Sequence, residues 1–75
     1  MATIKRIDNL RIKIYPGDHN PPHGHIEGPN VQIRFALQQF EILEGRSSIK
    51  QAAVAIEWVK ANLEHLQKIW NELQR

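Results

Sequence analysis

Apolar residues repeat at two different periods in the two halves of this 75-residue chain. Up to about residue 43 they recur at every second position, as in Leu10, Ile12 and Ile14, which is the pattern of a strand with one buried face. From Ser48 onward they recur every three or four positions, which is the spacing of one face of a helix. A run of strands followed by helices predicts an α+β domain.

The period-two half of the chain predicts an antiparallel sheet of about four to five short strands. We expect strands at residues 3–7, 10–15, 25–28, 31–35 and 40–43. Asp8-Asn9 and Pro29-Asn30 are typical turn sequences. Pro16-Gly17 ends the second strand, and Pro21-Pro22 predicts a stiff loop over residues 16–24. Short connections of this kind favour antiparallel pairing of neighbouring strands.

The other half of the chain predicts two C-terminal helices that pack on one face of the sheet. Ser48 and Gln51 form a capping-box pattern, so we expect the first helix to begin at Ser48. Asn62 is a good N-cap residue and predicts a tight corner before the second helix. We expect the two tryptophans to be core anchors rather than ligand contacts. The buried stripes predicted for the two helices are Ile49, Ala52, Ala53, Ile56 and Val59, and then Leu63, Leu66, Trp70 and Leu73.

Length and composition narrow the possible functions. The absence of cysteine excludes disulfides, thiolate zinc sites and thiol nucleophiles. A chain this short buries a small core, so added stability would have to come from a metal or from a partner chain, which includes a homodimer. No apolar run resembles a signal peptide or a membrane span, so we expect one cytoplasmic domain over residues 1–75 that does not associate with membranes.

Strand alternation also predicts which side chains lie on the sheet face that the helices leave uncovered. The residues expected there are Arg11, Lys13, Tyr15, His25, Glu27, Gln32 and Arg34. The formal net charge is only +2, but the basic excess lies before Gln39. This distribution suits an anionic partner such as RNA, whereas the modest total charge suits a protein partner. In the RNA hypothesis the nucleic-acid contacts are Arg11, Lys13, Tyr15 and Arg34.

One chemically unusual stretch, Asp18-His19-Asn20-Pro21-Pro22-His23-Gly24-His25-Ile26-Glu27, supports two hypotheses. In the first, His23, His25 and Glu27 are catalytic residues for RNA cleavage, because imidazoles suit proton transfer near neutral pH and need no cofactor. In the second, His19, His23 and His25 bind zinc or another transition metal, since His-x-His on a strand places both rings on one face. The second hypothesis describes a protein-interaction module without enzymatic activity, in which the histidine loop is a metal clip or a structural turn.

The same stretch resembles a family of short bacterial proteins, the domain of unknown function family 4160. The resemblance is carried by the Asp-His-x-Pro-Pro-His-x-His motif at residues 18–25, by Leu43-Glu44-Gly45, by Glu57-Trp58 and by Trp70. It implies a component of a toxin-antitoxin-type gene pair, toxin-like and encoded beside a small antitoxin-like partner protein. Gly24 stands where the family usually carries an aromatic or aliphatic residue, which predicts a looser loop around His23.

Overall fold

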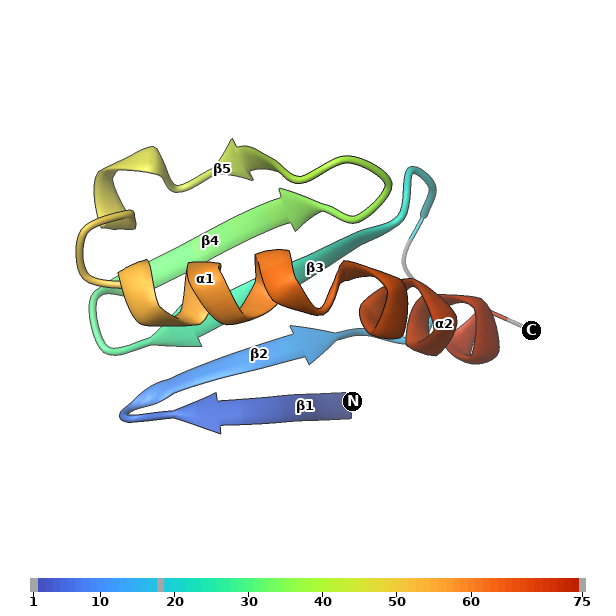
Figure 1. The fold of residues 1–75 in the computed structure, drawn as a ribbon, viewed down its shortest axis with the longest axis horizontal. Coiled ribbons are helices and arrows are strands. Elements are labelled where there is room, and N and C mark those ends of the chain that lie inside the picture. The colour runs from blue at the N-terminus through green and yellow to red at the C-terminus, as the bar shows by residue number, and fades with distance from the viewer. Residues whose placement is uncertain (1, 18, 75) are drawn as a thin grey trace.

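The computed structural model describes residues 2–17 and 19–74 of the chain. Over these residues five strands form one antiparallel sheet, and each strand pairs with the next along the chain (Figure 1). The strands are β1 (Ala2–Ile7), β2 (Leu10–Ile14), β3 (His23–Gly28), β4 (Val31–Ala36) and β5 (Glu41–Glu44). The predicted antiparallel sheet is therefore confirmed.

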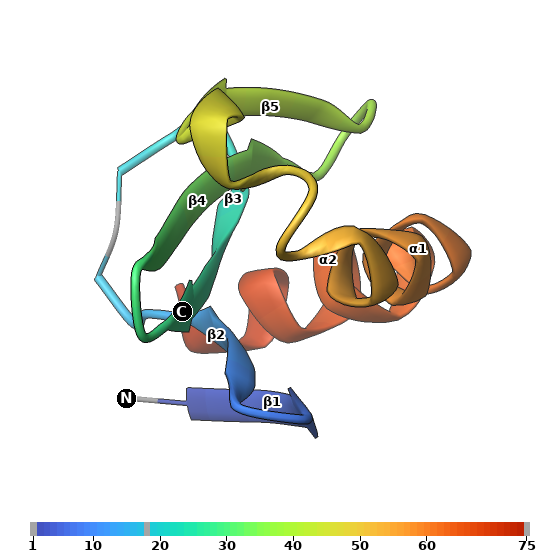
Figure 2. The same ribbon diagram turned by 90° about the vertical axis from the view of Figure 1, so that its left-hand side faces the viewer.

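The helices follow the sheet, as the change of period predicts. A short 3-10 helix, η1 (Arg46–Ser48), leads into α1 (Ala53–Ala61) and α2 (Leu63–Leu73). Helix α1 lies over one face of the sheet, and α2 continues past the end of β2 (Figures 1 and 2). The α+β class and the helical pair are confirmed. No helix in the described part of the chain is long and apolar enough to span a membrane.

The turns form where short polar residues and glycine allow a left-handed backbone. Asp8 and Asn30 have φ values of 53° and 62°, in the two turns predicted from Asp8-Asn9 and Pro29-Asn30. Gly45 follows β5 with a φ of 92°. A Cβ atom at this position would lie 2.1 Å from the carbonyl oxygen of Gln32, so only glycine fits this close approach to β4.

The core fills the space between the sheet and the helices. Alternation places Leu10, Ile12 and Ile14 of β2 on the buried face, as predicted. Their buried partners in the rest of the sheet are Ile26, Val31, Ile33, Phe35 and Leu37, and those in the helical half are Ala52, Ala55, Ile56, Val59, Leu66 and Trp70. These apolar side chains cover the helix-facing side of the sheet.

Helix α1 begins later than the sequence predicts. Ser48 is buried at the end of η1, and the N-cap position of α1 is Ala52, which makes no side-chain capping bond. The chain from Arg46 onward instead forms tight turns, in which the amide of Ile49 donates to the Arg46 carbonyl at 3.2 Å. Ile49 and Ala53 are therefore exposed, whereas Ala52, Ile56 and Val59 of the predicted stripe are buried as expected.

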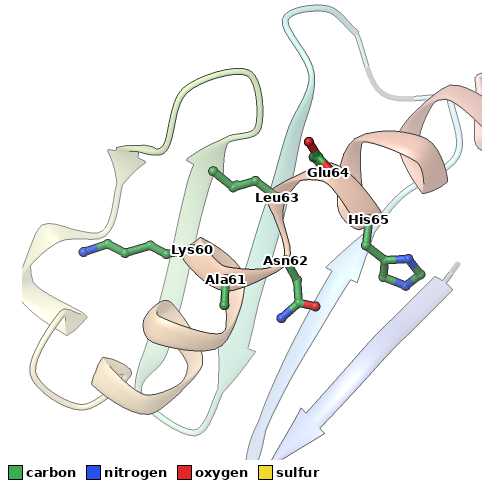
Figure 3. Close-up of a pocket in the computed structure, with 6 residues that line it drawn as sticks. All are labelled: Lys60, Ala61, Asn62, Leu63, Glu64 and His65. Atoms are coloured by element: carbon green, nitrogen blue, oxygen red, sulfur yellow. The ribbon is translucent and has the colours of Figure 1, made fainter.

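The corner between the two helices lies at Asn62, as predicted, but its side chain is used differently. Asn62 Nδ2 donates to the carbonyl oxygen of Trp58 at 2.8 Å, which ends α1 instead of capping α2. A cavity of about 320 Å³ lies at this corner. Its polar side chains diverge, with Lys60 and His65 pointing to opposite sides (Figure 3). This corner therefore does not gather the groups of a functional site.

Candidate functional site

The sheet face opposite α1 carries the candidate site residues of β2, β3 and β4. Strand register places Lys13 beside His25 and His25 beside Arg34, so one row crosses β2, β3 and β4. The segments 15–17 and 19–22 also lie on this side of the sheet (Figure 2). The face is less open than the alternation predicts, because Lys13 is buried and His25 and Glu27 are half-buried. We call this surface the histidine face.

Strand β3 begins two residues earlier than predicted, so His23 and Gly24 belong to the sheet and not to the loop. His23 pairs with Ala36, and the Leu37 amide donates to the Pro22 carbonyl at 3.1 Å. This backbone bond continues the β3–β4 pairing up to the end of the Pro-Pro segment.

The prediction that Gly24 loosens the loop around His23 is therefore wrong. Gly24 is buried in β3, opposite Phe35 of β4. A Cβ atom there would lie 2.7 Å from the Phe35 Cζ and 3.3 Å from the carbonyl oxygen of Lys13. Glycine leaves room for the Phe35 ring against the β3 backbone, so Gly24 is part of the packed sheet next to His23.

The carboxylate of Glu27 binds two other residues of the histidine face. Lys13 Nζ lies 3.2 Å from Oε1, and the Tyr15 hydroxyl donates to Oε2 at 2.7 Å. The Tyr15 hydrogen bond, followed by hydrogen bonding to Lys13 and the charges of Lys13 and His25, lowers the pKa of Glu27 below its ordinary value of 4.5 despite its partial burial. Glu27 is therefore ionised at neutral pH with both oxygens engaged, which suits positioning its neighbours better than transferring protons.

Four aromatic rings contact one another in a row that begins beside the Glu27 carboxylate. Tyr15 meets His25 edge-on with ring centroids 4.9 Å apart, and His25 meets His23 edge-on at 5.3 Å. His23 in turn contacts Trp70 of α2 at 5.2 Å. The two imidazoles of β3 thus lie side by side, each supported by a larger aromatic ring.

A backbone hydrogen bond orients His23. Its Nδ1 lies 2.9 Å from the carbonyl oxygen of Pro21. Because a carbonyl only accepts, this bond requires the proton on Nδ1 and assigns proton acceptance to Nε2 in the neutral ring. The Pro-Pro segment therefore fixes both the orientation and the tautomer of His23.

Arg34 lies between two cavities on the histidine face. The larger, about 470 Å³, is lined by His23 and the smaller, about 280 Å³, by His25, and Arg34 lines both. The Arg34 guanidinium is paired with Glu44 of β5, and both side chains are exposed. Its Nε is buried and has no hydrogen-bond partner. An exposed pair of this kind is weak, so the guanidinium is available to exchange Glu44 for a ligand anion.

Two of the remaining predicted site residues are placed differently by the structure: His19 lies at the histidine face, and Arg11 lies away from its cavities. Among the described residues no three His, Asp or Glu side chains are arranged to hold a metal ion, so His19, His23 and His25 do not form the predicted metal site. His19 lines the larger cavity together with His23 and Arg34. Arg11 lines a separate cavity beside the β1–β2 turn. Asp18 of the histidine motif lies outside the described residues.

Three neighbours of the histidines are absent from the site predicted from the strand pattern. They are Leu43 and Glu44 of β5, which line the two cavities, and Trp70 of α2, which contacts His23. Strand and helix periodicity assigns these residues to an edge strand and to the core. The signal that singles them out in the sequence is the resemblance, which rests in part on Leu43-Glu44-Gly45 and Trp70.

The fold and the histidine face together define a small α+β protein with paired imidazoles on one side of an antiparallel sheet. The family model named domain of unknown function (DUF4160) matches residues 9–71. This match covers most of the chain, so the protein belongs to that family, and the predicted membership is confirmed. No curated protein and no solved structure matches the chain.

Proposed function

We propose that this protein binds RNA on the histidine face and cleaves it with His23 and His25, as the toxin-like member of a bacterial toxin-antitoxin-type pair. The observation that carries the proposal is the arrangement of three side chains. His23 and His25 lie side by side on β3, and each lines a cavity that Arg34 also lines. Two groups able to transfer protons therefore lie next to each other, and each shares a cavity with the same cation. The protein would act in the cytoplasm beside a small antitoxin-like protein.

The proposed reaction needs no cofactor. His23 Nε2 accepts the proton of a ribose 2′-hydroxyl, and the resulting oxygen attacks the adjacent phosphorus. The bond from phosphorus to the 5′-oxygen breaks, and His25 gives a proton to that leaving oxygen. The products are a 2′,3′-cyclic phosphate and a 5′-hydroxyl. Arg34 stabilises the charge that develops on the phosphoryl oxygens.

The other predicted residues take different parts in this proposal. Lys13 is buried and paired with Glu27, so its charge organises the face rather than contacting phosphate. Tyr15 and Glu27 are positioning residues, since the Tyr15 ring contacts His25 and its hydroxyl binds Glu27. Arg34 is the phosphate contact that we retain from the four predicted ones, because it is exposed and lies next to both histidines.

The test is cleavage of a fluorescently labelled RNA by the purified protein in the presence of EDTA. His23→Ala and His25→Ala are each expected to lower the rate at least 100-fold, the usual effect of losing a general acid or base. His65→Ala is the matched control, because His65 is an exposed histidine on α2. Thermal unfolding checks that the variants fold. Cleavage that persists when both His23 and His25 are replaced, or no cleavage by the wild-type protein, overturns the proposal.

A second candidate function is a protein-interaction module without catalysis. The observation that favours it is the charge balance of the histidine face, where Lys13 pairs with Glu27 and Arg34 pairs with Glu44. A balanced surface attracts nucleic acid weakly and suits a small partner protein or a second copy of the chain. This candidate predicts a dimer mass in light scattering, or a complex with a co-expressed neighbour, together with no RNA binding at low salt.

A further inference from the structure

We infer that the larger cavity on the histidine face is a binding site for one nucleobase, so the RNA substrate is single-stranded where it is cut. This inference rests on the proposed function, because it takes the phosphate to lie beside His23, His25 and Arg34. The cavity has a volume of about 470 Å³ and lies between segment 19–21, β4 and β5.

The lining of this cavity matches the chemistry of a base. Leu43 and Pro21 present apolar surface, on which the flat face of a base can pack. Asn20 carries an amide that both donates and accepts hydrogen bonds, as the edge of a base requires. Leu43 is 37% exposed, so it is one of the large apolar side chains that the structure leaves open to solvent. An apolar wall beside a cation suits a ligand that is flat at one end and anionic at the other.

The position of Arg34 indicates where the phosphate of the bound nucleotide would lie relative to its base. Arg34 lines both cavities, so a phosphate on its guanidinium has a cavity on either side. The smaller cavity, about 280 Å³, is lined by the polar side chains of His25, Gln32 and Glu44 as well as Arg34. A dinucleotide with its phosphate at Arg34 would therefore place one nucleoside in each cavity, with the base of one against Leu43.

This geometry selects against paired RNA. In an RNA helix the bases are stacked inside and paired, and a side chain reaches a base face only after the base leaves the stack. A base that packs against Leu43 and Pro21 has left the stack. Single-stranded RNA presents such bases without the cost of breaking pairs.

The test compares adenosine 5′-monophosphate with ribose 5-phosphate, which carries the same phosphate without a base. Calorimetric titration of the wild-type protein is expected to show about tenfold tighter binding of the nucleotide, which corresponds to burying roughly 60 Å² of apolar base surface. Leu43→Ala is expected to remove most of this preference. Ile49→Ala is the matched control, because Ile49 is 39% exposed and lies outside the cavity, and it should keep the full preference.

The outcomes separate this inference from the proposed function. Equal affinity for the two phosphates, or equal losses in Leu43→Ala and Ile49→Ala, overturns the base site even if His23 and His25 cleave RNA. Equal cleavage rates on a single strand and on its duplex overturn it as well. A tenfold preference that depends on Leu43, in a protein that cleaves no RNA, supports the base site and overturns only the cleavage. If the cavity instead binds an apolar side chain of a partner protein, Leu43→Ala will weaken binding of that protein and the two phosphates will bind equally. This outcome also overturns the base site.

Discussion

Replacing Glu27 by glutamine is expected to lower the free energy of unfolding by about 2 kcal/mol at pH 7. Removing one partner of a buried ion pair costs about 3–5 kcal/mol. The Lys13 side chain is 8% exposed but that of Glu27 is 23% exposed, so water screens part of the interaction. Glutamine also keeps an oxygen that accepts from Tyr15. Both effects reduce the cost, and what remains is the loss of negative charge beside a buried ammonium.

A loss of this size is large for a small domain. A chain of this length has a total stability of roughly 4–11 kcal/mol. At about 4–8 °C per kcal/mol, Glu27→Gln should lower the Tm by roughly 8–16 °C. Urea unfolding followed by circular dichroism measures the free energy directly.

The matched control is Glu44→Gln, which makes the same chemical change on the same face. Glu44 pairs with Arg34, but its side chain is 67% exposed, so its loss is expected to cost no more than about 0.5 kcal/mol. A double-mutant cycle with Lys13→Met isolates the coupling between Lys13 and Glu27. If Glu27→Gln and Glu44→Gln destabilise the protein equally, the reasoning about burial is refuted.

The pH dependence of stability provides an independent check on Glu27. Its pKa lies below 4.5 in the folded protein, chiefly because Tyr15 donates to the carboxylate, and close to 4.5 in the unfolded chain. A lowered pKa means that the stabilisation is fully present above about pH 4.5 and is lost as the pH falls through the folded value. The wild-type protein should therefore have a higher free energy of unfolding than Glu27→Gln at neutral pH, and this difference should disappear only below about pH 4.5. An advantage that is constant from pH 7 down to strongly acid solution would contradict the assignment.

Three further substitutions test the packing, each followed by urea unfolding. Gly24→Val is expected to cost about 1–3 kcal/mol, because its Cβ would meet the buried Phe35 ring, and an unchanged midpoint would contradict the contact. Gly45→Ala should lower the free energy of unfolding by at least about 2 kcal/mol, since it adds a steric clash to a left-handed backbone. A variant as stable as the wild-type protein would show that the chain after β5 does not require glycine. Leu66→Ala should cost about 2–5 kcal/mol, whereas Val54→Ala at an exposed site should stay within about 0.5 kcal/mol, and similar losses would refute the assignment of the core.

Strand and helix periods were sufficient to predict most of this fold because they are local properties. The alternation of Leu10, Ile12 and Ile14 identifies the buried face of β2 whatever β2 pairs with, and the same rule holds for β4. The boundaries that depend on tertiary contacts were predicted less well. Strand β3 gains His23 through its pairing with Ala36, and α1 starts at Ala53 because η1 precedes it.

The candidate site was predicted in part for the same reason. Alternation correctly places Lys13, His25 and Arg34 on one face, and strand register makes them neighbours. Alternation does not indicate which charged side chains pair with each other. The sequence pattern therefore does not predict the buried Lys13–Glu27 pair or the exposed Arg34–Glu44 pair. These pairs decide which cation is available to an anion, and they depend on side-chain packing that a period does not encode.

The contact between Trp70 and His23 shows why the site and the core of so small a protein are not separable. Trp70 is 3% exposed and belongs to the core cluster, yet its ring lies 5.2 Å from that of His23. Gln74, just after α2, also donates to the backbone of Tyr15, 59 positions earlier in the chain. The C-terminal segment therefore contacts both His23 and the backbone of Tyr15, whose ring contacts His25. In the reaction that we propose, a small misplacement of His23 or His25 would be costly, so the packing of α2 against His23 matters to this site as much as the strands do.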